Sequence, residues 1–156
     1  VIPDPSADQL VHIAKSTATN HRLFTKQEPR VAFLSFSTHG SAQHESVDKM
    51  RTACEQFRNA HPDILADGEL QFDAATIPSV AARKCPDSAL AGNANVFLFP
   101  NLDAGNIAYK LTERLAGFEA YGPLLQGLSK PWLDLSRGCS AEDIVGVATI
   151  ASAMID

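Results

Sequence analysis

The residues best suited to chemistry lie between Asp134 and Asp143, near the end of the sequence. This stretch contains the hydroxyl of Ser136, the guanidinium of Arg137 and the thiol of Cys139, and an apolar run follows it. Helix N-termini present unpaired N–H groups and the positive end of the helix dipole, and a guanidinium binds phosphate through two parallel hydrogen bonds. The spacing therefore predicts a local anion site without a Walker-type loop.

The same stretch also has a purely structural interpretation. Ser140 and Asp143 have the spacing of a capping box, and helical periodicity follows over residues 144–154. In this interpretation Cys139 fills a gap in the core and Arg137 lies at the surface. Spacing alone leaves both interpretations open.

Two segments further upstream, 31–36 and 96–99, are almost continuously apolar and predict strands covered on both faces. Each precedes a polar loop and a helical pattern, which is where open α/β sheets bind ligands. The hydroxyl side chains after the first strand could bind a phosphate ligand or close the turn by internal hydrogen bonds. The acidic and amide side chains after the second strand are more usually an N-cap and a turn residue. The candidate binding residues in these loops are Ser37, Thr38, Asp103 and Asn106.

Apolar residues recur with helical spacing on both sides of these strands. Strands that alternate with helices predict a layered α/β domain with a mainly parallel sheet, and the length of 156 residues suits one domain. The expected helices are 7–24, with Ser6 and Gln9 as a capping box, then 45–59, 78–84, a segment from about 107 to 115, and the C-terminal run; a turn or short strand is expected at 66–73 and a further strand at 118–121.

The composition predicts a globular protein that does not bind nucleic acid or membranes. The net charge of -5 offers no electrostatic attraction to either, and no apolar run approaches the roughly 18 residues of a membrane span. The sequence does not begin with Met or with a secretory signal pattern, and we expect that an upstream segment is missing.

Cysteine and histidine spacing assigns no metal. Cys54, Cys85 and Cys139 contain no C-x-x-C pair, which argues against a disulfide framework or a zinc site and favours a reducing cytoplasm. The five histidines form no close ligand cluster. Neither a G-x-S-x-G elbow nor a glycine-rich nucleotide loop is present in the sequence.

Four separated blocks, 34–42, 67–75, 99–107 and 134–140, together resemble the phosphate acetyltransferase (phosphotransacetylase) family. The resemblance runs from about Ile2 to the C-terminus. Four blocks in this order indicate the family more specifically than any single block does. The Ser136-Arg137-Gly138-Cys139-Ser140 block is the most specific of the four.

The resemblance implies reversible acetyl transfer between acetyl-CoA and inorganic phosphate, which gives acetyl phosphate and coenzyme A without a metal, a prosthetic group or a covalent enzyme intermediate. It implies an α/β/α fold similar to that of isocitrate and isopropylmalate dehydrogenases, in a cytoplasmic homodimer. Residues 1–156 would form the second half of the transferase, and the last helix, about 140–154, would return to the missing first domain. The fragment alone would have little or no activity.

By the same resemblance, Asp143 matches the proposed general base for the coenzyme A thiol. Ser136 matches a serine that stabilises the reacting centre, and Arg137 matches an arginine that binds the phosphoryl group. Cys139 lies near the site without a required nucleophilic role. His39 stands where such sequences often have lysine, so a cationic contribution there depends on its protonation.

Two other functions fit the same residues. A phosphate butyryltransferase or another phosphate acyltransferase would share these blocks, because none of them defines an acyl pocket. A non-catalytic acetyl-CoA-sensing domain, as in malic enzyme fusions, would bind the ligand without reaction. Such domains resemble this sequence less over residues 136–140, which favours catalysis.

Overall fold

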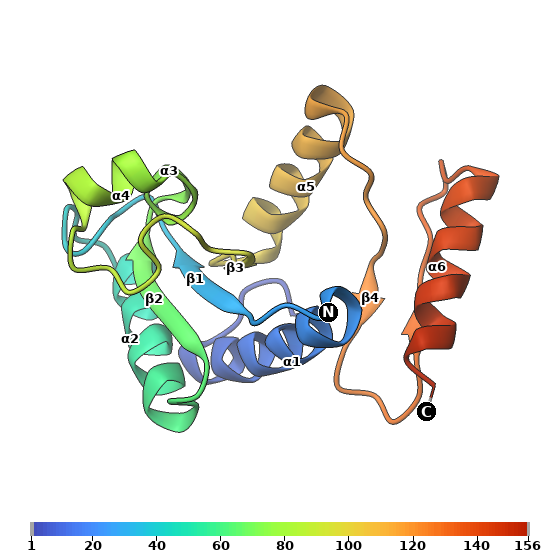
Figure 1. Ribbon diagram of the computed structural model, residues 1–156, viewed down its shortest axis with the longest axis horizontal. Coiled ribbons are helices and arrows are strands. Elements are labelled where there is room, and N and C mark those ends of the chain that lie inside the picture. The colour runs from blue at the N-terminus through green and yellow to red at the C-terminus, as the bar shows by residue number, and fades with distance from the viewer. Residues whose placement is uncertain (1, 156) are drawn as a thin grey trace. The chain divides into compact units, whose positions relative to one another are not determined.

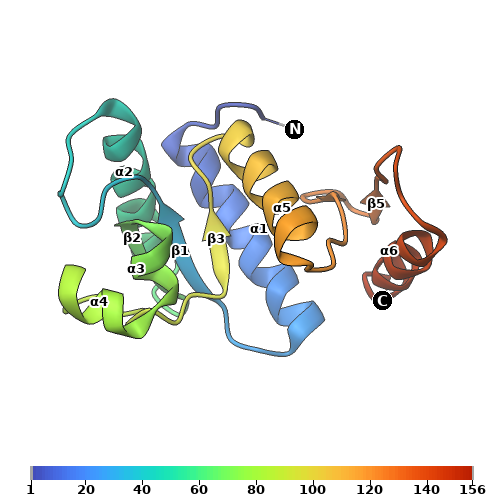
Figure 2. The same ribbon diagram turned by 90° about the horizontal axis from the view of Figure 1, so that it is seen from above.

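A parallel three-stranded sheet forms the core of the first part of the protein (Figure 1). Its strands are β1 (Arg30–Leu34), β2 (Leu65–Leu70) and β3 (Val96–Leu98), with β1 between the other two (Figure 2). Four of the five residues of β1 are buried, as expected of a strand covered on both faces. The computed structural model describes residues 2–155.

Helices cover both faces of this sheet. Two of them pack on one face around Phe33 and Phe57, whose ring centroids lie 5.7 Å apart, and two shorter helices pack on the other face against Leu34 and Leu70. The first pair is α1 (Ala7–Thr25) and α2 (Glu45–Ala60), and the second pair is α3 (Phe72–Thr76) and α4 (Pro78–Lys84). The predicted three-layer α/β/α fold with a parallel sheet is confirmed.

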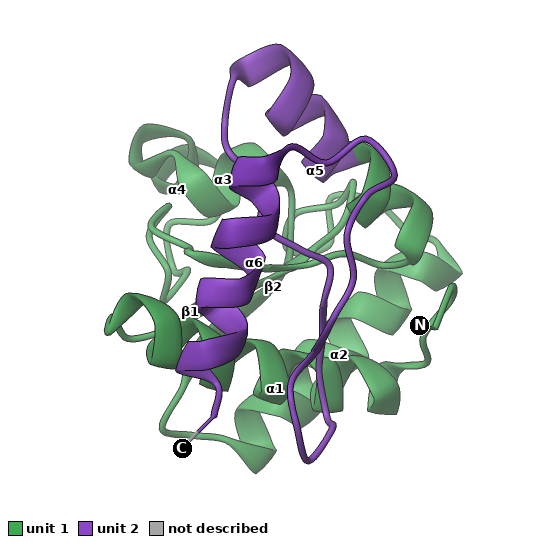
Figure 3. Cartoon of the chain, turned by 90° about the vertical axis from the view of Figure 1, so that its right-hand side faces the viewer, with its two compact units in different colours: residues 1–107 green, residues 108–156 purple. Residues whose placement is uncertain are grey.

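The chain divides into two compact units, residues 1–107 and 108–156 (Figure 3). The boundary falls within α5 (Leu102–Ala116). The second unit continues with a two-stranded antiparallel ribbon of β4 (Leu124–Leu125) and β5 (Trp132–Leu133), followed by α6 (Ala141–Ala153). Within the described part of this unit, Val147 alone is buried.

The sequence predicted one domain, whereas the structure divides the chain into the two compact units given above, with nearly all of the buried apolar residues in the first. The strand expected at 118–121 was wrong, because pairing occurs further on, between Leu124–Leu125 and Trp132–Leu133. The helix expected from about 107 begins at Leu102, because Asn101 caps it by accepting the N–H of Ala104 at 2.9 Å.

Most of the other local predictions agree with the structure. α1 begins with the predicted capping box of Ser6 and Gln9, and α4 has the predicted bounds Pro78–Lys84. Most of the segment expected as a turn or short strand, 66–73, is β2, which pairs in parallel with β1, but its last two residues begin α3, a helix that was not predicted. Over the residues that the structure describes, no helix is long and apolar enough to cross a membrane.

Candidate functional site

The candidate residues of the first unit follow two neighbouring strands. β1 and β3 are hydrogen-bonded in parallel, so the loops after them leave the sheet at the same edge. Ser37 and Thr38 follow β1, and Asp103 and Asn106 follow β3. Open α/β sheets bind ligands at this edge, where neighbouring strands lead to different sides.

The loop after β1 uses its hydroxyls within the protein. Ser37 is fully buried, and its Oγ donates to Oε1 of Glu69 at 2.8 Å and accepts the N–H of Ala42 at 3.0 Å. Thr38 is also buried, and its Oγ1 accepts the N–H of Gln71 at 2.9 Å. Turn closure, one of the two interpretations of these hydroxyls, is thus present, and their contact with substrate stays a prediction.

The candidate side chains after β3 lie in the first turns of α5 and are exposed. Asn101 rather than Asp103 supplies the cap of α5, and Asn106 lies inside the helix rather than in a turn. Within residues 2–155, neither the Asp103 nor the Asn106 side chain has a hydrogen-bond partner. Both are therefore available to a ligand.

The second unit holds the stretch from Ser136 to Asp143. Ser140 caps α6 by accepting the N–H of Asp143 at 3.1 Å, and Oδ2 of Asp143 accepts the N–H of Ser140 at 2.8 Å. The predicted capping box is therefore confirmed. The second carboxylate oxygen, Oδ1, has no partner in the described part of the chain, so the cap orients Asp143 and still leaves an acceptor for a proton.

Ser136, Arg137 and Cys139 form the turn that leads into this helix. Oγ of Ser136 accepts the N–H of Gly138 at 3.3 Å, and its carbonyl accepts the N–H of Cys139 at 3.0 Å. Arg137 is exposed and forms no ion pair with any described residue. The structure therefore groups Ser136, Arg137, Cys139 and Asp143 in one unit, and Ser37, Thr38, Asp103 and Asn106 in the other.

Sequence reasoning missed a polar cluster around β2. Glu69 is 1% exposed and receives hydrogen bonds from the loop after β1 and from Arg51 of α2. Burial by itself would raise the pKa of Glu69, but hydrogen bonds from Arg51, the Gly40 N–H and Ser37 outweigh it and lower the pKa below its ordinary value. The spacing of Asp67 and Glu69 within an otherwise apolar strand was the available signal.

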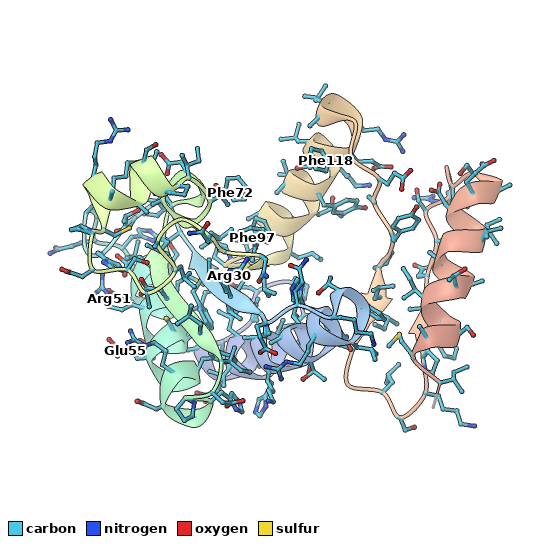
Figure 4. The ribbon with its side chains drawn as sticks, in the orientation of Figure 1. Arg30, Arg51, Glu55, Phe72, Phe97 and Phe118 are labelled. Carbon is cyan, nitrogen blue, oxygen red and sulfur yellow. The ribbon has the colours of Figure 1, made fainter. Side chains whose placement is uncertain are left out.

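His39 and Asp67 lie beside this cluster. Nε2 of His39 is 3.3 Å from each oxygen of the buried Asp67 carboxylate, but only Oδ1 has hydrogen-bond geometry. His39 and Asp67 border a cleft of about 300 Å³ next to α2. Arg51 and Glu55, which also line this cleft, are labelled in Figure 4. The buried thiol of Cys54 also borders it; burial raises the pKa of this thiol to about 12, so it stays protonated and is not a nucleophile. Among residues 2–155, no His, Cys, Asp or Glu group could hold a metal.

These features define an α/β protein whose candidate ligand-contacting groups lie after parallel strands and at a capped helix N-terminus. Both are places where protein backbones bind anions. Residues 1–152 match the family model described as phosphate acetyl/butaryl transferase, and the chain belongs to that family.

Individual relatives agree with this assignment. The phosphate acetyltransferase of Acetivibrio thermocellus is 53% identical over 152 residues, which are 97% of this chain and 46% of that protein. That of Bacillus subtilis is 51% identical over 149 residues, or 96% of this chain and 46% of that protein. The crystal structure of a phosphotransacetylase from Streptococcus pyogenes matches with a TM-score of 0.92 and 53% identity, over 98% of this chain and 46% of that one. The chain thus spans less than half the length of these relatives.

Proposed function

We propose that this chain is the second half of a phosphate acetyltransferase, which transfers an acetyl group reversibly between acetyl-CoA and inorganic phosphate. The observation that carries the proposal is the identity of 51–53% with curated phosphate acetyltransferases over nearly the whole chain. The exposed Arg137 and the oriented Asp143, at the start of one helix, supply suitable groups.

In the direction of acetyl-CoA formation, the proposed first step is proton transfer. A thiol with an ordinary pKa of about 8.5 is mostly protonated at neutral pH, so the Asp143 carboxylate accepts the S–H proton as the sulfur attacks. The new S–C bond forms at the carbonyl carbon of acetyl phosphate, whose electron pair moves to the carbonyl oxygen. Ser136 donates a hydrogen bond to that oxyanion.

The tetrahedral species then collapses. The C–O bond to phosphate breaks, and its electron pair leaves with the phosphate, whose charge Arg137 stabilises. Acetyl-CoA and inorganic phosphate are the products, and the reverse sequence makes acetyl phosphate. Coenzyme A and acetyl-CoA act here as substrates, and the proposal assigns no prosthetic group.

The assembly and location of the complete protein belong to the same proposal. We propose a cytoplasmic homodimer in which this chain follows a first domain, and the last helix returns to that domain. The free thiols of Cys54, Cys85 and Cys139 support a reducing compartment. Size-exclusion chromatography with light scattering of the full-length protein tests the dimer.

The test of the activity is acetyl phosphate formation from acetyl-CoA and phosphate by the full-length protein that contains this chain. Robust activity is expected there, and little from the chain alone, since it spans less than half the length of its relatives. Because the family description includes butyryl transfer, butyryl-CoA is assayed in parallel. Ligand binding without turnover of any acyl-CoA would favour the sensing function instead.

A further inference from the structure

The Glu69 carboxylate is the point on which the loop after β1 converges. Its Oε1 accepts hydrogen bonds from Ser37 Oγ at 2.8 Å and from the Gly40 N–H at 2.7 Å. Arg51 of α2 donates to both oxygens, through Nη2 at 3.2 Å and Nε at 3.0 Å. The Glu69 carbonyl also accepts the N–H of His39 at 3.1 Å. One buried residue thus receives donors from the loop and from a helix.

An irregularity in β2 places this side chain. Phe33 pairs with Gly68 and Leu34 pairs with Leu70, so Glu69 is an extra residue between two pairs. Such bulges change the direction of a side chain relative to a regular strand. Gly68 permits the close approach, because a Cβ there would lie 2.6 Å from Cβ of Phe33.

The loop does not hold this conformation through its own preferences. His39 has a φ of 44° and Gly40 a φ of 84°, and a left-handed residue other than glycine is unfavourable without external support. These two residues direct their N–H groups at Glu69. The Gly40 N–H and the Ser37 hydroxyl thus hold an internal anion, the Glu69 carboxylate, whereas the His39 N–H bonds to the neutral Glu69 carbonyl.

We propose that Glu69 is a positioning residue for the phosphoryl end of the substrate. This inference rests on the proposed function. Glu69 holds residues 37–41 in place, and through them the exposed hydroxyl of Ser41, which accepts the Thr38 N–H at 3.0 Å. This hydroxyl lies in the loop that leaves the ligand-binding edge of the sheet and contacts acetyl phosphate there.

The test measures steady-state kinetics of the full-length transferase with Glu69→Gln, which keeps the size of the side chain and removes its charge. The KM for acetyl phosphate is expected to rise about tenfold, with kcat and the KM for coenzyme A each within about twofold, because a misplaced binding loop weakens ground-state and transition-state binding together. Glu69→Asp, which restores the carboxylate, should recover part of the loss.

A second variant keeps the inference testable if Glu69→Gln does not fold. Arg51→Gln removes a partner from the partly exposed side of the cluster and should raise the same KM about threefold. The matched control is Glu55→Gln, on the same helix and beside the same cleft, where no hydrogen bond or ion pair to a described residue is lost. Its kinetic constants should equal those of the wild type.

The outcomes separate this inference from the proposed function. An unchanged KM for acetyl phosphate in folded Glu69→Gln and Arg51→Gln protein would overturn the positioning role and leave the transferase function intact. Equal losses for both substrates, or a loss confined to kcat, would also overturn it. Absence of acetyl transfer by the wild-type full-length protein would overturn the proposed function itself.

Discussion

The loop after β1 and the turn before α6 both resemble anion sites, but they are built differently. In the loop, donors from the loop itself and from α2 converge on the buried Glu69 carboxylate of β2. In the turn, the contacts are local: Ser140 and Asp143 cap their own helix, and Arg137 stays exposed. The comparison teaches that a tertiary network can satisfy an anion-binding loop internally, whereas a local cap leaves charged groups for a ligand.

The largest expected effect concerns the base in the turn. In the full-length enzyme, Asp143→Asn should lower kcat at least about a hundredfold with a modest change in KM, because general-base catalysis typically contributes that much. Asparagine still accepts the Ser140 N–H, so the cap persists. Initial rates with acetyl phosphate and coenzyme A measure the effect. Intact turnover combined with lower stability would show that Asp143 is only a cap.

The second largest effect is expected at Arg137, the cation of the same turn, and concerns the binding of phosphate and acetyl phosphate. Arg137→Ala should raise the KM for phosphate and for acetyl phosphate by roughly ten- to a hundredfold, as expected from the loss of a charge-assisted hydrogen bond of about 1.5–3 kcal/mol. Lys130→Ala, which removes an exposed cation from the same unit, is the control. Equal effects of the two substitutions would indicate general electrostatic attraction instead of a specific contact.

A substitution at Gly68 should disturb the strand that positions Glu69. A Cβ there would lie 2.9 Å from the Phe33 carbonyl oxygen, so Gly68→Ala should destabilise the chain by about 2–3 kcal/mol through overpacking. Urea unfolding followed by circular dichroism measures the change. Gly105→Ala is the control, since its Cβ would have an ordinary contact of 3.6 Å within a helix and should not destabilise.

Acidification should weaken the hydrogen bonds that hold the loop after β1 to Glu69. The pKa of Glu69 is lower in the folded protein than in the unfolded chain, so its contribution to stability is present above the unfolded pKa of about 4.3 and is lost as pH falls through the lower folded pKa. Urea unfolding between about pH 6 and pH 3 should show a smaller loss for Glu69→Gln than for the wild type. Equal losses in the two proteins would contradict this role.

The smallest expected effect is at Ser140. Removal of its cap by Ser140→Ala should cost about 1 kcal/mol of helix stability. Activity of the full-length enzyme should change little, because the Asp143 carboxylate keeps its bond to the Ser140 N–H. Thermal unfolding and initial rates test the two parts separately. A loss of activity as large as that of Asp143→Asn would give Ser140 a direct role.

Local sequence signals predicted much of the fold. The capping boxes at Ser6 and Ser140, the bounds of α4 and the buried strands all depend on residues within a few positions of each other. The strand predicted at 118–121 failed because ribbon pairing depends on a partner, residues 132–133, that no local pattern specifies. The division into two units likewise depends on which residues pack together across the chain, and no local pattern specifies that.

The sequence by itself determined most of the helices, the buried strands and the capped turn with Ser136, Arg137 and Asp143, because capping and periodicity act over short separations. Only the tertiary structure decided the environment of Glu69. The Glu69 carboxylate is buried and fully hydrogen-bonded only when three parts of the chain meet. They are the bulge in β2, the loop about 30 residues upstream and the helix α2 between them. Burial and hydrogen bonding at such distances are properties of the packed chain, and no local pattern of residue types encodes them.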